Sequence, residues 1–181
     1  MKQGFYVLMF VVLIGGSCGN SSNQDVVKIK AAEAKLRSAP ANQRMDETIA
    51  NEAIQSYTEY ADKHKGDSAS AGYLFLAADI MRGIGKSKEC LPIYERILKE
   101  HPNYSKAATC LFLIGFTYDN DLKNLEKAKE VYQQFLIKYP SHELVKDVQF
   151  SLDHLGKSPE DIIKEFELKQ KNNVDSTQKK V

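Results

Sequence analysis

Cysteine and histidine are the residues of this chain whose side chains most readily serve as nucleophiles or metal ligands. The cysteines are Cys18, Cys90 and Cys110, and the histidines are His64, His101, His142 and His154. No two histidines have the His-x₃-His spacing, and no cysteine–histidine cluster has the spacing of a zinc site. The sequence also contains no glycine-rich phosphate loop and no Gly-x-Ser-x-Gly motif. We therefore expect no enzyme, no metal and no cofactor.

Cys18 is the one cysteine whose surroundings indicate chemistry. Lys2 is the only charge before it, residues 5–14 are continuously apolar or aromatic, and residues 15–17 are Gly-Gly-Ser. A charged start, a short apolar middle and a small-residue exit are typical of a secretory signal peptide. The apolar run is shorter than the roughly 20 residues that a membrane-spanning helix needs.

The segment that ends at Cys18 resembles the lipobox of bacterial lipoproteins, although leucine is preferred at the position of Gly15. The resemblance implies that residues 1–17 are removed as a signal peptide and that Cys18 receives a diacylglycerol, which anchors the chain in the bacterial envelope. An ordinary cleaved signal with an incidental cysteine and an uncleaved membrane anchor are the alternatives. Residues 18–24 are polar and uncharged, which predicts a flexible tether.

The charge balance and the start of the mature chain bear on location and partners. Without residues 1–17 the chain has 24 basic and 24 acidic residues, so it has no charge excess that would attract nucleic acid. Lipoproteins displayed on the cell surface resemble one another in carrying acids directly after the lipidated cysteine, and here Asp25 is the first acid. We therefore expect the periplasmic side of a membrane, with the outer membrane favoured. The remaining length suits one domain.

A small residue followed four positions later by tyrosine recurs along the chain at intervals of 37 and 38 residues. The pairs are Ala53 and Tyr57, Cys90 and Tyr94, and Ala128 and Tyr132. The small residue lets a neighbouring helix approach and the tyrosine fills the gap between hairpins. Pro102 and Pro140 end the second and third copies. Such a period predicts stacked helical hairpins.

Apolar spacing and turn residues divide the rest of the chain into helices. We expect helices at 25–37 and 46–64, hairpins over 68–102 and 108–140, a helix at 143–155 and a last helix from 159. Ser87 is expected to cap the second helix of its hairpin. Ile162, Ile163 and Phe166 are expected to make the last helix a lid on the stack, with residues 169–181 disordered. Cys90 and Cys110 are expected to be buried and reduced.

The hairpins resemble tetratricopeptide repeats over roughly residues 46–155. The residues that match are Leu111, Ile114, Gly115, Tyr118, Ala128, Tyr132 and Pro140 in one unit and Leu74, Ala77, Ala78, Met81, Cys90, Tyr94 and Pro102 in the other. The resemblance implies an all-α protein, a short α-solenoid of tetratricopeptide-like hairpins over residues 25–168 with a C-terminal capping helix.

The same resemblance implies a concave groove that binds protein segments and is lined by the first helix of each hairpin. The groove residues carried over by position are Phe75, Asp79, Arg82, Phe112, Phe116 and Asp119. A neighbouring helix could instead bury the phenylalanines. The expected function is a lipid-anchored scaffold for other envelope proteins. An accessory subunit that binds a ligand in a carbohydrate- or peptidoglycan-processing system is the alternative, and self-association through exposed aromatics stays open.

Overall fold

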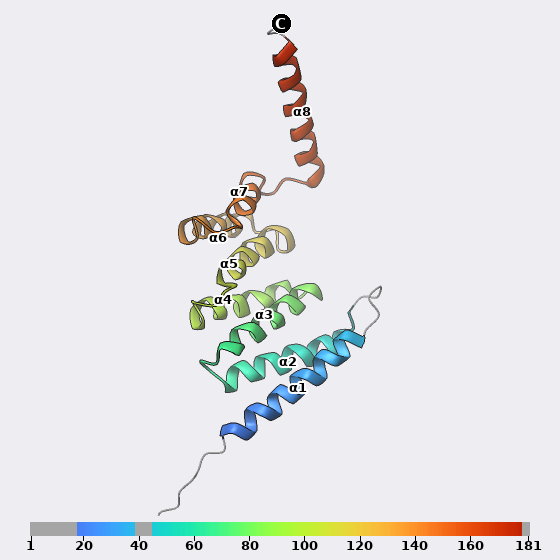
Figure 1. Ribbon diagram of the computed structural model, residues 1–181. Helices are drawn as coiled ribbons and strands as arrows, with labels where there is room; N and C mark the ends of the chain where they lie inside the picture. The colour runs from blue at the N-terminus through green and yellow to red at the C-terminus, as the bar shows by residue number, and fades with distance from the viewer. Residues whose placement is uncertain (1–17, 39–44, 179–181) are drawn as a thin grey trace, which may run out of the picture.

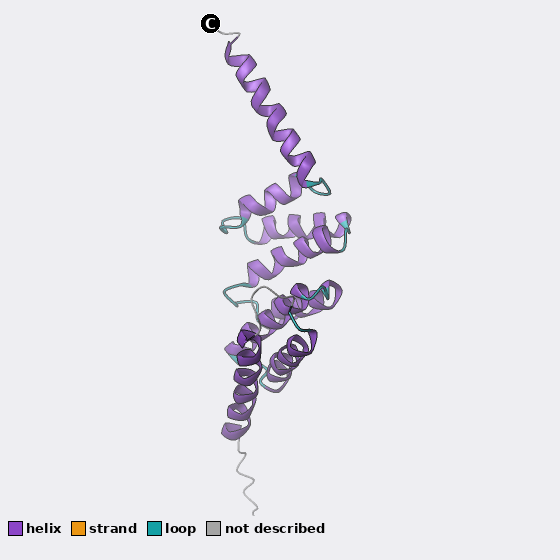
Figure 2. Ribbon diagram, turned by 90° about the vertical axis from the view of Figure 1, so that its right-hand side faces the viewer, coloured by secondary structure: helices purple, strands orange, loops and turns teal. Residues whose placement is uncertain are grey.

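The described part of the chain, residues 18–38 and 45–178 of a computed structural model, is a row of antiparallel helices with no strand among them (Figure 2). The helices are α1 (Cys18–Ser38), α2 (Glu47–Lys63), α3 (Ser68–Gly83), α4 (Ser87–Glu100), α5 (Ala107–Phe116), the π-helical turn η1 (Thr117–Asp121), α6 (Leu125–Lys138), α7 (Val145–Asp153) and α8 (Pro159–Gln178). Successive helices from α1 to α7 pack against each other (Figure 1). The expected all-α solenoid of helical hairpins is confirmed.

The recurring small-residue and tyrosine pairs lie in the core of the stack. Tyr57, Tyr94 and Tyr132 are all buried, as are the small residues four positions before them. Three apolar clusters follow one another along the stack, and each draws its residues from three or more consecutive helices. Because every hairpin buries its apolar face against its neighbours, the fold is stabilised mainly by contacts between adjacent units.

Local signals explain where most helices begin and end. Asp67 caps α3 by accepting a hydrogen bond from the Ala69 backbone N–H at 2.9 Å, and Ser158 caps α8 by accepting from the Asp161 N–H at 3.1 Å. Gly156, between α7 and α8, has the left-handed φ of 74°. The predicted cap at Ser87 is wrong, because the N-cap of α4 is Lys86 and the Ser87 hydroxyl donates to Asp121 at 2.8 Å instead.

Two segments expected to be irregular are helical. Residues 18–24 form the first turns of α1 rather than a flexible tether, and α8 continues to Gln178 past the expected start of a disordered tail at residue 169. Neither helix contains an internal proline, and each further residue that joins an existing helix adds one backbone hydrogen bond at little cost. The predicted signal peptide, most of the break after α1 and residues 179–181 lie outside the described residues.

The prediction that α8 forms a lid on the stack is wrong. Helix α8 points away from the stack in both views (Figures 1 and 2), and the side chains of Ile163 and Phe166 are 58% and 46% exposed. Its contact with α7 is made near its start, where the Phe166 ring lies 6.4 Å from Phe150 and 6.0 Å from His154, measured between centroids. The apolar face of α8 is therefore too short and too weakly packed to cover the end of the stack.

Candidate functional site

The six predicted groove residues lie on α3, α5 and η1, and their three phenylalanines are half-buried. Phe75 packs its ring 6.0 Å from Tyr94 and 6.4 Å from Tyr104, with the Lys106 ammonium 4.6 Å from its centroid. Phe112 lies 6.2 Å from Tyr132. Phe75 and Phe112 thus each pack on a buried tyrosine while staying partly exposed, which gives partial support to burial. Their role in binding stays a prediction.

Arg82 links two neighbouring hairpins of the groove. Its guanidinium is 3.3 Å from the Asp79 carboxylate on the same helix and its Cζ lies 5.9 Å from the ring centroid of Phe116 on α5. Phe116 in turn lies 6.1 Å from Phe112. The structure therefore brings Asp79, Arg82, Phe116 and Phe112 together in one strip, while Phe75 lies apart against the α4–α5 turn.

A pocket of about 510 Å³ opens at one end of this strip, between η1, α7 and the turn that leads to α8. We call it the corner pocket. Its apolar lining is Phe116, Leu125, Phe150 and Ile162, and its polar lining includes Asp119, Asn120, Lys123, Ser151, His154 and Lys157. The mixture of aromatic rings with a few convergent polar groups is typical of a binding site.

Asp119, which lines the corner pocket, and its buried neighbour Tyr132 are in unusual electrostatic surroundings. Burial raises the pKa of Asp119 above its ordinary value, opposed by the nearby Lys123 ammonium and the backbone N–H of Gly156. The Tyr132 side chain is fully buried, its hydroxyl has no hydrogen-bond partner among the described residues, and burial raises its pKa to about 12.

The backbone beside the corner pocket is irregular. The turn η1 closes through a hydrogen bond from the Leu122 N–H to the Thr117 carbonyl, and Lys123 has a positive φ of 53°. A π-helical turn and a left-handed residue other than glycine both cost free energy relative to regular helix and are enriched at binding sites. In this chain η1 contains Asp119 and Asn120, and both of them and Lys123 line the pocket.

Sequence reasoning missed the half of the corner pocket that α7 provides. Phe150 is 38 residues beyond Phe112, and His154 is 38 residues beyond Phe116, so both occupy groove positions of the next hairpin. The repeat interval was therefore a signal that could have identified them. No such signal exists for Lys157 and Ile162, because they belong to the turn and helix after the last match to the repeat pattern.

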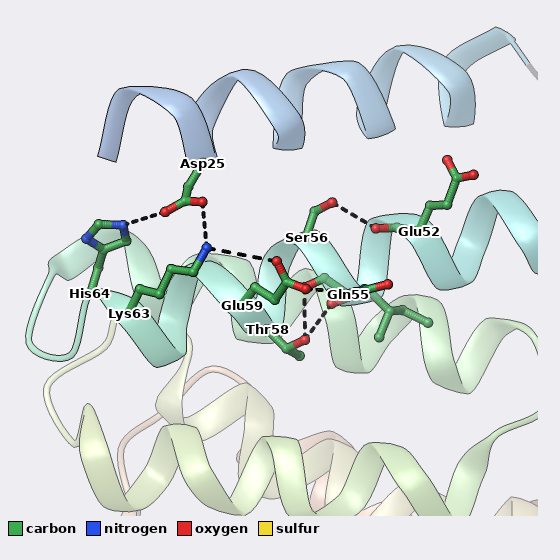
Figure 3. Close-up of polar contacts among 9 residues, drawn as sticks. Asp25, Glu52, Gln55, Ser56, Thr58, Glu59, Lys63 and His64 are labelled. Carbon is green, nitrogen blue, oxygen red and sulfur yellow. Dashed lines mark hydrogen bonds and ion pairs between the residues drawn. The ribbon is translucent and has the colours of Figure 1, made fainter. Parts of the chain in front are cut away.

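A second polar cluster fixes α1 to α2, at the other end of the stack (Figure 3). The buried carboxylate of Asp25 accepts a hydrogen bond from Lys63 Nζ at 2.8 Å and lies 3.1 Å from His64 Nε2. The hydrogen bond from Lys63, with His64 acting in the same direction, lowers the pKa of Asp25 below its ordinary value of 3.8. The two hydroxyl side chains drawn nearby, Ser56 and Thr58, donate to backbone carbonyls of α2 and not to His64. We therefore interpret the cluster as a structural contact that holds α1 against α2.

We expect Asp25→Asn to lower the free energy of unfolding at neutral pH and to lower it less in acid. The folded pKa of Asp25 lies below its unfolded value, so its stabilising contribution is complete above about pH 4 and is lost as the pH falls through the folded pKa. Urea unfolding of the wild type and the variant from neutral to acidic pH measures the difference. A difference that stays constant down to the acid limit would contradict this assignment.

The remaining chemistry-bearing residues are accounted for by packing. Cys90 and Cys110 are both buried and free, as predicted, and burial raises the pKa of Cys90 to about 11 and that of Cys110 to about 12. The side chain of Cys18 lies outside the described residues. Within residues 18–38 and 45–178 no group of three or more potential ligand side chains is placed to hold a metal ion, and no helix is long and apolar enough to cross a membrane.

Comparison with known families gives one result, which covers the middle of the stack. Residues 73–104 and 109–142 each match the tetratricopeptide repeat family. The first match contains α4 and most of α3, and the second contains most of α5, all of η1 and all of α6. No curated protein sequence matches the chain. The corner pocket therefore lies where the second repeat meets the unmatched helices α7 and α8.

Proposed function

We propose that this chain, which carries two tetratricopeptide repeats, is a lipid-anchored scaffold that binds other proteins of the bacterial envelope at its corner pocket. Repeats of this family commonly mediate protein–protein interactions, and proteins built from them are typically not catalytic. The observation that carries the proposal is the corner pocket itself. It combines aromatic and polar side chains on the first helices of successive hairpins, where the predicted groove residues Phe116 and Asp119 lie.

The proposed location is the periplasmic side of a membrane, with the outer membrane favoured. It is supported by the short apolar run of residues 5–14 and the small residues before Cys18. Two acyl chains on one cysteine hold a protein on a bilayer far more firmly than a single chain does. Because α1 begins at Cys18, such an anchor would keep the first hairpin close to the bilayer surface.

Cys18→Ser is expected to release the protein from the membrane fraction of its bacterial host, because serine cannot carry the thioether-linked lipid. The intact mass of the wild type should show acyl groups on residue 18 and the absence of residues 1–17. The variant should instead be found in the soluble fraction of the host. A wild-type chain that is soluble, or cut at another position, would remove the anchor from the proposal and leave the protein-binding scaffold.

Partner binding is tested by a photo-crosslinking residue at Asn120, which is exposed and lines the corner pocket. In host cells we expect a discrete crosslinked product, which disappears when Phe116→Ala is added because the pocket loses one aromatic wall. The matched control is the same residue at Gln133, exposed on α6 and absent from the pocket lining, which should give no such product. Equal crosslinking at both positions, or no effect of Phe116→Ala, would contradict a pocket-specific partner.

A ligand-binding subunit of a carbohydrate- or peptidoglycan-processing system is the second candidate. The observation that favours this candidate is the lining of the corner pocket, where the aromatic side chains of Phe116 and Phe150 lie beside the polar groups of Asn120 and Ser151. Peptidoglycan fragments should then raise the unfolding temperature of the wild type more than that of Phe150→Ala. If no fragment shifts the wild type, this candidate is wrong.

A further inference from the structure

Helix α8 lacks the residues that let the earlier helices close a hairpin. In α2, α4 and α6 a small residue and a tyrosine four positions later are both buried against the preceding helix. One repeat interval beyond Ala128 and Tyr132, at 37 or 38 residues, the chain has Glu165 or Phe166 and then Lys169 or Gln170. A charged or bulky side chain at the first of these positions prevents the close approach of two helices. This explains why α8 leaves the stack (Figures 1 and 2).

Exposed apolar side chains remain where α8 departs from α7. Phe150 on α7 is 44% exposed, and Ile163 and Phe166 on α8 are 58% and 46% exposed. The rings of Phe150 and Phe166 are stacked, with an angle of 10° between their planes. We call these three residues the elbow patch. A contiguous apolar patch of this kind is typical of a surface that another protein covers.

The charges along α8 indicate what covers it. Glu165 and Lys169 pair with each other at 3.0 Å, and Glu165 also pairs with Lys157. The acids left near the start of the helix include Glu160 and Asp161, and Lys171 is a base left beyond Leu168. A second α8 running antiparallel would place the acidic start of each helix beside Lys171 of the other. A parallel partner would place like charges together, which costs free energy.

We infer that α8 pairs antiparallel with α8 of a second copy of this chain, so that the two elbow patches meet at a two-fold axis near Phe166. Such a contact uses the same surface on both copies, and it therefore closes as a dimer. The pairing leaves the concave strip on α3 and α5 open, but it covers Phe150, which also lines the corner pocket, so a second copy and a pocket partner would compete for that side chain. This inference does not depend on a lipid anchor or on an envelope partner.

The first test measures the mass of the full chain by light scattering over a range of protein concentrations, in one mild detergent throughout. The wild type should become dimeric as concentration rises, and Phe166→Ser should stay monomeric at concentrations where the wild type is a dimer. Leu168→Ser is the matched control, because Leu168 is 61% exposed but lies two positions further on, on the opposite side of the helix. A monomeric wild type, or equal effects of both substitutions, would overturn the inference.

The second test determines the direction of the pairing. Glu160→Cys and Lys171→Cys lie on the same side of α8, about 16 Å apart along the helix axis and nearly equidistant from Phe166. In an antiparallel pair, a short bis-maleimide should link a Glu160→Cys copy to a Lys171→Cys copy and link neither variant to itself. Self-linked products would indicate a parallel pair, and no product above the wild-type background would indicate no pair; either result overturns the inference.

Discussion

Gly115→Ala is expected to destabilise the protein by about 2–3 kcal/mol, although alanine is the better helix former. A Cβ at position 115 would lie 2.7 Å from both Cδ1 and Cε1 of the Tyr132 ring. Tyr132 is fully buried, with its own neighbours in the core, so the ring cannot move aside without opening the contact between α5 and α6. The steric cost therefore exceeds the gain of about 1 kcal/mol that glycine-to-alanine changes give within a helix.

Gly72→Ala is the matched control for this prediction. Gly72 lies inside α3, and the nearest atom to its added Cβ is the Tyr104 hydroxyl oxygen at 4.0 Å. This variant should gain about 0.5–1 kcal/mol from reduced freedom of the unfolded chain. Chemical unfolding of the wild type and both variants gives the two changes. If the two substitutions shift the free energy of unfolding in the same direction, the close packing of Gly115 on Tyr132 is wrong.

If Gly115→Ala does not fold, a double variant can still test the contact between positions 115 and 132. Tyr132→Leu removes the ring that the new methyl group meets, so Gly115→Ala should cost less in that background than in the wild type. The difference between the two costs measures the coupling between positions 115 and 132 directly. Two equal costs would place the strain elsewhere.

Helix boundaries were predictable wherever a local signal decides them. Residues 46–64 were expected as a helix and form Glu47–Lys63, because Asp46 caps one end and the core-facing residues keep a helical spacing throughout. Gly156 and Ser158 mark the junction between α7 and α8 in the same local way. The cap predicted at Ser87 is wrong because the Ser87 hydroxyl donates to Asp121 instead. Asp121 is 34 residues away, so the nearby sequence gives no sign of this contact.

The C-terminal helix shows where the repeat pattern stops being informative. Ile162, Ile163 and Phe166 have the spacing of a buried helical face, and that spacing alone predicts a lid. Whether a helix can close on its neighbour depends on what stands opposite, and Phe166 is too large for the position that Ala128 fills in α6. The expected lid is therefore wrong because α8 lacks the small residue that the earlier copies have. Aligning the copies shows this difference, whereas hydrophobic periodicity alone does not.

The candidate site was predictable in part for the same reason. Phe116 and Asp119 followed from their place on the first helix of a hairpin, and the structure places both in the lining of the corner pocket. Its other walls come from α7 and from the turn before α8, and the irregular η1 contains Asp119. No spacing rule covers a pocket that a repeat forms together with segments outside the repeat.

Tyr94→Ala is expected to cost about 3–5 kcal/mol, because Tyr94 is fully buried and its removal leaves a large cavity in the central cluster of the stack. Tyr94→Phe should instead change stability by less than about 1 kcal/mol. The Tyr94 hydroxyl is buried with no hydrogen-bond partner among the described residues, so its removal relieves a desolvation cost rather than breaking a bond.

Tyr60→Phe provides the contrast that makes the Tyr94 prediction specific. The Tyr60 hydroxyl donates to the Asp67 carboxylate at 2.6 Å, and this hydrogen bond to a charged group raises the pKa of Tyr60 to about 12. Its loss should cost about 1.5–3 kcal/mol. Thermal and urea unfolding of the three variants rank the costs, with Tyr94→Ala above Tyr60→Phe and Tyr94→Phe close to the wild type. If Tyr94→Phe costs as much as Tyr60→Phe, the Tyr94 hydroxyl has a partner in solution, for which the nearby Arg82 side chain is the first candidate.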